Sequence, residues 1–132
     1  MSVVLDHLVI PVRDRHTSAA FVAWLLDATQ QADVGAFTPV EVGALTLKFD
    51  DRFPCSVGHY AFAVDAETFF RIAQRLVASS VNFGSSPEAG WDRAFGSADQ
   101  TIRVYVEDAN GHHYEFFATG TPPRGSARPL VD

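Results

Sequence analysis

The hydrophobic and polar positions along the chain form two similar series of elements. The first series opens with Val3–Val12, where apolar residues on both faces predict a buried strand, and continues with a helix ending near Leu26 and a hairpin turning at Gly43. The second series opens with an alternating strand at His59–Val64, followed by a helix that Asp65 can cap. The shared order of strand, helix and further strands predicts an α+β protein made of two related modules.

After the second helix the pattern becomes less regular. Gly84–Gln100 is rich in glycine, serine and charged residues, which predicts a long loop. We expect a single domain over residues 1–118, with modules at about 1–50 and 58–118. Residues 119–132 contain two dipeptides with proline and are expected to form a C-terminal tail.

A closing hairpin is predicted over Arg103–Phe117, because Asn110-Gly111 tolerates the positive φ that a tight turn requires. A two-residue turn would set Glu115 opposite Val106, and a four-residue turn would set it opposite Val104. Both registers place Glu115 on the apolar face, whereas a three-residue loop would place it on the other face. An inward-facing carboxylate is costly unless a cationic group meets it.

Three residues that can bind a metal lie on predicted strands and face inward, namely His7, His59 and Glu115. Two imidazoles and one carboxylate leave open coordination positions, as a catalytic divalent metal requires. Their separations in sequence are too wide for a local finger, so the sheet would have to assemble them. Structural alternatives remain open. Each histidine, taken alone, could be a buried residue whose hydrogen bonds are satisfied within the core, and Glu115, taken alone, could form an ion pair with Arg93 or Arg103.

The predicted loop holds candidates for substrate binding. Trp91 and Phe95 either line a pocket or pin the loop, and Arg93 is a candidate contact to the substrate. Tyr105 has parity opposite to Glu115 in the expected registers, which predicts a packing role. His112 lies at the predicted turn and is expected to be solvated.

Composition narrows the classes of function. The chain has 132 residues, 47% of them hydrophobic, which is enough for the core of one ordinary domain. Its formal net charge of −6 and the absence of a basic run argue against nucleic acid or an anionic membrane as partner. The single cysteine, Cys55, excludes a disulfide framework and suits a reducing interior. The N-terminal segment lacks a basic start and soon reaches Pro11, so we expect neither a signal peptide nor a membrane span there. We therefore expect a cytoplasmic protein.

Three segments together carry a resemblance to a known superfamily: LDHLVIPV at residues 5–12, GHYAFAVD at 58–65 and YVEDANGHHYEFF at 105–117. They resemble the vicinal oxygen chelate superfamily, which includes glyoxalase I, fosfomycin resistance thiol transferases, extradiol dioxygenases and bleomycin resistance proteins. The resemblance spans about residues 3–118. It implies two βαβββ modules whose mixed sheets form an open cup around a metal.

The same resemblance implies the metal ligands His7, His59 and Glu115, with Glu115 also a catalytic base in some members. The cofactor would be one divalent metal per site: Fe, Mn, Ni, Zn or Co. In single-chain members of this size two subunits complete each cup, which implies a homodimer in which His7 of one chain joins His59 and Glu115 of the other.

The implied function is a metal-dependent enzyme, a lyase, isomerase, dioxygenase or thiol transferase, that binds a small substrate through adjacent oxygens. The alternative is a metal-free dimer that sequesters a toxin or antibiotic, as in bleomycin resistance. The chain departs from individual members at motif positions, such as Val9 where fosfomycin enzymes carry threonine. The resemblance therefore implies the superfamily and not one named activity.

Overall fold

The computed structural model describes residues 1–119 and 130–131, which fall into two compact units with boundaries at 1–56 and 57–132. The first unit contains β1 (His7–Pro11), α1 (Arg15–Leu26), β2 (Thr29–Gln30), β3 (Phe37–Val42) and β4 (Leu45–Asp50). The second contains β5 (His59–Ala63), α2 (Ala66–Val77), β6 (Phe83–Gly84), the 3₁₀ turn η1 (Pro87–Ala89), β7 (Phe95–Ala98), β8 (Thr101–Glu107), β9 (His113–Thr119) and β10 (Leu130–Val131). In the described part of the chain, no helix has the length and apolar character needed to cross a membrane.

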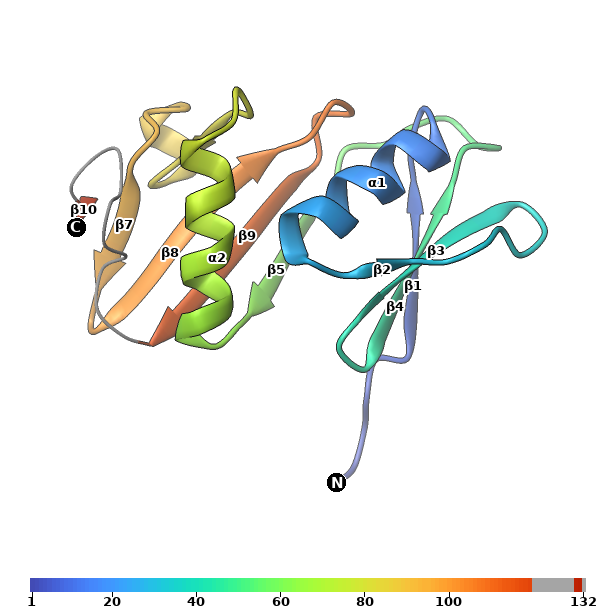
Figure 1. The fold of residues 1–132 in the computed structure, drawn as a ribbon, viewed down its shortest axis with the longest axis horizontal. Coiled ribbons are helices and arrows are strands. Elements are labelled where there is room, and N and C mark those ends of the chain that lie inside the picture. The colour runs from blue at the N-terminus through green and yellow to red at the C-terminus, as the bar shows by residue number, and fades with distance from the viewer. Residues whose placement is uncertain (120–129, 132) are drawn as a thin grey trace. The chain divides into compact units, whose positions relative to one another are not determined.

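In the first unit, one helix covers one face of a four-stranded sheet of order β1-β4-β3-β2 (Figure 1). Strand β1 runs parallel to β4, and the other pairs are antiparallel. The fully buried side chains Ile10, Leu47 and Phe49 project from the face that packs against α1. The alternate positions, which include His7 and Val9, project from the opposite face. Strands β1 and β4 therefore have an apolar side toward the helix and a more open side.

Strand β1 is shorter and more exposed than the sequence predicted. Instead of a strand buried on both faces over Val3–Val12, the structure has five strand residues, and Val3, Val4 and Leu5 before them are largely exposed. The reason is that only one helix packs against this sheet within its unit, so only one face of β1 is covered. A continuous apolar run did not distinguish burial on two faces from burial on one.

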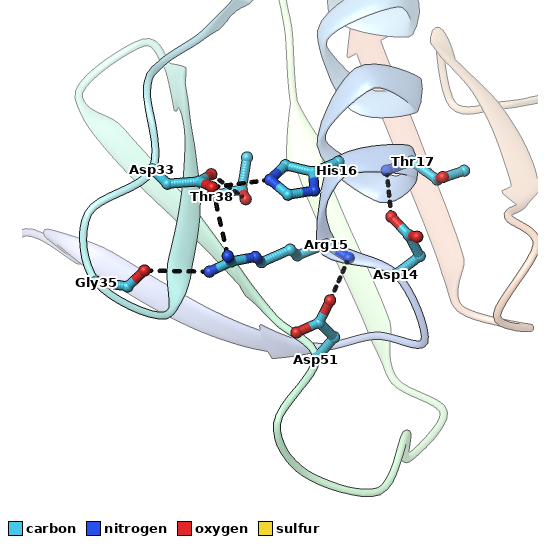
Figure 2. Close-up of polar contacts among 8 residues, drawn as sticks. All are labelled: Asp14, Arg15, His16, Thr17, Asp33, Gly35, Thr38 and Asp51. Carbon is cyan, nitrogen blue, oxygen red and sulfur yellow. Dashed lines mark hydrogen bonds and ion pairs between the residues drawn. The ribbon is translucent and has the colours of Figure 1, made fainter.

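The start of α1 is tied to the connection between β2 and β3 (Figure 2). Asp14 caps the helix by accepting a hydrogen bond from the Thr17 N–H at 2.9 Å. Asp33 lies 2.8 Å from His16 Nε2 and 3.4 Å from a guanidinium nitrogen of Arg15. Hydrogen bonds from Thr38 and His16 hold the pKa of the Asp33 carboxyl below its ordinary value. His16 is therefore engaged in a local structural contact.

A buried carboxylate ends β4. The side chain of Asp50 is only 1% exposed and accepts three hydrogen bonds from Arg52: two from its guanidinium group, at 2.9 and 3.1 Å, and one from its backbone N–H at 2.9 Å. The side-chain hydrogen bonds from Arg52, followed by the backbone one, hold the pKa of Asp50 below its ordinary value. Ionised Asp50 therefore stabilises the fold.

This pair predicts an acid sensitivity. Since the pKa of Asp50 is lower in the folded than in the unfolded chain, its contribution is present above the unfolded value, about 3.9, and is lost as the pH falls through the folded value. We expect Asp50→Asn to lower the free energy of unfolding at pH 7 and to flatten its decline below about pH 4. Urea unfolding between pH 7 and pH 2.5 measures both effects. Glu41→Gln, at an exposed position of β3, is the control; parallel pH curves for wild type and Asp50→Asn would contradict the prediction.

In the second unit, α2 covers one face of a sheet of order β10-β7-β8-β9-β5, with β6 paired to β8 (Figure 1). Strands β5 and β9 are parallel, as are β10 and β7, whereas β8 is antiparallel to β6, β7 and β9. Val104, Tyr114 and Phe116 of this sheet are buried, at 1% exposed or less, on the side of the buried helix residues Phe69 and Leu76. The predicted α+β class with open, mixed sheets is confirmed.

The segment predicted as one long loop, Gly84–Gln100, contains regular structure. It holds the η1 turn and strand β7, which pairs with β8 from Gly96↔Arg103 to Ala98↔Thr101. The glycine and serine content that suggested a loop instead fits close packing, because a side chain at Gly96 would approach the Ser85 carbonyl oxygen to 2.8 Å. Of the predicted tail at residues 119–132, residues 120–129 and 132 lie outside the described part, Thr119 ends β9, and Leu130–Val131 pair with β7.

Candidate metal centre

Glu115 lies on the face of the second sheet that is opposite to α2. The hairpin pairs Glu107 with His113 and Tyr105 with Glu115, so its loop has five residues, Asp108–His112. The predicted registers, in which Glu115 faces Val104 or Val106 on the apolar side, are therefore wrong. An odd number of loop residues moves every side chain of β9 to the other face relative to an even number. Glu115 consequently lies on the side opposite to the helix, where most of its side chain is still shielded from solvent.

Asp108 sets the length of this loop. Its carboxylate accepts hydrogen bonds from the N–H groups of Asn110 and His112, at 2.9 and 2.8 Å, and its carbonyl accepts one from Gly111. His112 is fully buried, and its Nδ1 accepts a hydrogen bond from the Gly58 N–H at 2.9 Å. The prediction that His112 is solvated was therefore wrong. Asp108 and His112, the two ends of the loop, are both buried and lie outside the paired strands. In a tighter turn these two residues would belong to the strands.

His59 and Glu115 meet on the open face. Because β5 and β9 are parallel and Ala61 is the partner of Glu115, His59 and Glu115 project from the same side, and His59 Nε2 lies 3.0 Å from Glu115 Oε1. The His59 side chain is half exposed at 52%, whereas that of Glu115 is 14% exposed. The Tyr105 ring lies 6.0 Å from the His59 ring, centroid to centroid. An imidazole, a carboxylate and a phenol thus gather on neighbouring strands.

The spacing of this pair fits two ligands of one metal ion. Nitrogen and oxygen ligands about 2.1 Å from a divalent cation and about 90° apart lie about 3.0 Å from each other. The observed separation between His59 Nε2 and Glu115 Oε1 is 3.0 Å. In neither unit, over its described residues, do three His, Cys, Asp or Glu side chains gather to hold a metal. A third protein ligand for a metal at this pair would therefore have to come from outside the described residues of the second unit.

His7 occupies the corresponding place in the first unit. It begins β1 as His59 begins β5, and it projects from the face opposite the helix. Its side chain is 48% exposed, and its Nδ1 lies 2.9 Å from Asp6 Oδ2. A carboxylate on one ring nitrogen is the contact that orients many metal-binding histidines and leaves the other nitrogen for the metal. His7 is therefore an exposed residue with one ring nitrogen beside a carboxylate, and it is not a core residue.

The three residues predicted to bind substrate have different surroundings. The guanidinium of Arg93 donates hydrogen bonds to four carbonyl oxygens at and beyond the end of α2, and it covers the Phe83 ring at 4.5 Å. Phe95 is fully buried, with its ring 6.1 Å from the Phe69 ring. Trp91 packs edge-on against His113 at 5.3 Å. The contacts of Arg93 and Phe95 therefore stabilise the core. Trp91 instead lies beside His113, which projects from the same face of β9 as Glu115.

Tyr105 and Arg103 lie on the same face of the sheet as Glu115, a placement that was not predicted from the sequence. Tyr105, predicted to be a packing residue, is directly opposite Glu115. Arg103, weighed only as an ion-pair partner for Glu115, lies two residues before Tyr105 on the same side of β8. The alternation along β8 places Arg103 and Tyr105 on one face of the strand. Only the register of the hairpin shows that this is the face that carries Glu115.

Comparison with known proteins places this geometry in context. No protein-family model matches the chain, and no curated protein matches it significantly. Among solved structures, the oxidase ChaP-H2 superimposes with a TM-score of 0.81 at 28% identity, over 96% of this chain and 100% of that one. The oxidase ChaP-H1 gives 0.78 at 29% identity, over 94% and 99%.

A more distant neighbour is the fosfomycin resistance protein FosX from Listeria monocytogenes, whose structure was determined with Mn(II) and sulfate ion. It superimposes with a TM-score of 0.65 at 18% identity, over 92% of this chain and 93% of that one, a level at which the likeness shows the fold. The FosX and ChaP neighbours all have the fold of the vicinal oxygen chelate superfamily. The resemblance seen in the sequence motifs is confirmed, and the chain is similar in fold and sequence pattern to the vicinal oxygen chelate superfamily.

Proposed function

We propose that the protein is a divalent-metal-dependent enzyme in which His7, His59 and Glu115 bind one metal ion. The observation that carries this proposal is the His59–Glu115 pair, with nitrogen and oxygen 3.0 Å apart on the open face of a rigid sheet. The exposed position of His7 and its contact with Asp6 support it as the third ligand. Such a metal would act as a Lewis acid toward two adjacent oxygens of a small substrate.

The surroundings of the pair suit a substrate-binding face. Ala61 and Ala63 project from the same side of β5 as His59, and their small side chains leave space above the sheet. The ring of Tyr105, which is 8% exposed, meets the His59 ring in an edge-to-face arrangement. In this proposal the Tyr105 hydroxyl holds a proton near a substrate oxygen, and Glu115 shares the role of ligand and base.

Oxidation is the reaction class that we propose. The neighbours at 28% and 29% identity, which match over nearly their whole length, are both oxidases. A redox-active ion such as iron or manganese fits a site of two imidazoles and one carboxylate. Dioxygen would be the oxidant, and the substrate would be a small molecule with two adjacent oxygens.

We further propose a homodimer in which His7 of one chain completes the site that His59 and Glu115 form in the other. Its support is that no third metal-binding side chain joins His59 and Glu115 among the described residues of the second unit, together with the dimer that the superfamily resemblance implies. Rigid strands from both units would then hold the ligand positions.

Metal content tests the proposed function. The protein, purified without chelator, is analysed for Fe, Mn, Ni, Zn and Co by plasma mass spectrometry, and again after removal of metal and reloading with each ion. We expect close to one metal ion per chain, with iron or manganese supporting oxygen consumption in a screen of compounds with adjacent oxygens. Failure of the wild type to take up any of these metals when they are supplied would overturn the proposal.

A further inference from the structure

A pocket of about 240 Å³ lies in the second unit, next to the open face. It is formed where the segment after β6 approaches β7 and β8. Its walls are three serines, Ser85, Ser86 and Ser97, together with Gly96, two alanines and the side chain of Arg103. The pocket thus combines one cation with small side chains and hydroxyl groups.

Arg103 is the unusual member of this pocket. Its Nε is buried and has no hydrogen-bond acceptor among the described residues. No carboxylate of the described residues lies within ion-pair distance of its guanidinium group. Buried donors in folded proteins almost always have a partner, so an unpaired guanidinium N–H at a pocket indicates a place for an acceptor.

Gly96 allows Arg103 to take this position. A Cβ at Gly96 would lie 3.0 Å from Arg103 Cγ and 2.8 Å from the Ser85 carbonyl oxygen. The stem of Arg103 therefore crosses β7 where only glycine leaves room.

The other polar groups of the pocket also favour an acceptor. The Ser86 hydroxyl oxygen accepts a hydrogen bond from the Ala89 N–H at 3.2 Å, which leaves its hydrogen to donate. The nearest carboxylate to Ser85 is Asp92, whose oxygens accept hydrogen bonds from the Ser85 N–H and hydroxyl and from the Ala94 N–H. Asp92 is therefore held by other donors and is not part of the pocket wall.

We infer that this pocket binds an oxyanion group, a carboxylate or a phosphate-type group, through the guanidinium of Arg103 and the hydroxyl of Ser86. The planar guanidinium matches two oxygens of either group. Arg103 lies on the same side of β8 as Tyr105, about 7 Å along the strand. One small molecule can therefore reach both places. The inferred class of substrate rests on the proposed function. On that basis, the substrate is an acid with its charged group at Arg103 and its adjacent oxygens beside Tyr105.

The test uses metal-free protein, so that it does not depend on the metal site. The arginine Nε–Hε signals of ¹⁵N-labelled full-length chain are assigned by triple-resonance spectra and followed by NMR during titration with inorganic phosphate and, separately, with acetate. Chloride keeps the ionic strength constant. We expect a saturable shift of the Arg103 Nε–Hε signal, and the anion that binds more tightly identifies the group as phosphate-type or carboxylate.

Two variants that remove the same charge make the comparison sharp. Because Arg103→Gln lacks the Arg103 signal, binding to the wild type and to both variants is also followed through the backbone amide signals of Ser86 and Gly96 at the pocket. Arg103→Gln should weaken anion binding at least 10-fold, whereas Arg71→Gln, on the exposed face of α2, should change it less than 2-fold. Equal weakening by both variants would overturn the inference. So would a wild-type Arg103 signal that shows no saturable shift with either anion, a result that stands even if Arg103→Gln does not fold. Metal uptake is measured separately, so failure of anion binding and failure of the metal site are distinguishable.

Discussion

His59→Ala is expected to leave the protein folded but unable to retain a metal ion. The variant removes one of the two side chains that meet at 3.0 Å, and it leaves His7 and Glu115 as two ligands where a catalytic site of this kind uses three. The loss of affinity should exceed the roughly 10- to 100-fold that is usual for residues that only orient a ligand. Because the His59 side chain is half exposed, we expect the free energy of unfolding of the metal-free protein to change by less than about 0.5 kcal/mol. Metal analysis and urea unfolding measure the two quantities.

His16→Ala is the matched control, because this histidine is also exposed but contacts Asp33 in the first unit. It should retain the metal content of the wild type. A His59→Ala protein that keeps stoichiometric metal would show that the ion binds elsewhere.

Mixing variants tests whether two chains share a site. If His7 of one chain joins His59 and Glu115 of the other, random mixing of His7→Ala and His59→Ala chains makes half of the dimers hybrid, each with one intact site. Metal content should then recover to about a quarter of the wild-type value. No recovery, in a mixture shown by mass spectrometry to contain hybrids, would place all three ligands in one chain.

Arg93→Ala is expected to destabilise the protein by about 3 kcal/mol. The substitution removes the guanidinium that donates to the carbonyl oxygens of Leu76, Val77, Ser79 and Val81, and it uncovers the Phe83 ring. These carbonyls lie at and just beyond the C-terminal end of α2, where a positive charge also interacts favourably with the helix dipole. Metal content and anion binding should persist in the folded fraction, and urea unfolding measures the loss of stability.

Arg71→Ala separates this effect from the general loss of an arginine. Arg71 forms an exposed pair with Glu67 one helical turn away, so its removal should cost less than about 0.5 kcal/mol. Arg93→Lys should fall between the two, because an ammonium keeps the charge but cannot reach four carbonyls. Equal stability of Arg93→Ala and Arg71→Ala would contradict the structural role of Arg93.

The positions of site residues along the strands depended on local geometry that composition did not reveal. The motif around Asn110 predicted the hairpin, but its five-residue loop follows from the hydrogen bonds that Asp108 accepts and from the burial of His112. That single difference reversed the predicted face of Glu115 and brought Tyr105 beside it. Similarly, the loop composition around Arg93 suggested substrate contact, whereas its donors reach the end of α2.

The sequence by itself determined the α+β class, the two series of elements, the capped helices and the two strands on which His59 and Glu115 lie. These follow from hydrophobic periodicity and turn residues, which act over a few neighbouring positions. Only the tertiary structure decided which face each side chain takes, that His59 and Glu115 approach to 3.0 Å, and that Arg103 lies at a pocket. The physical reason is that strand pairing has a period of two, so one additional loop residue exchanges the buried and open faces of a whole strand.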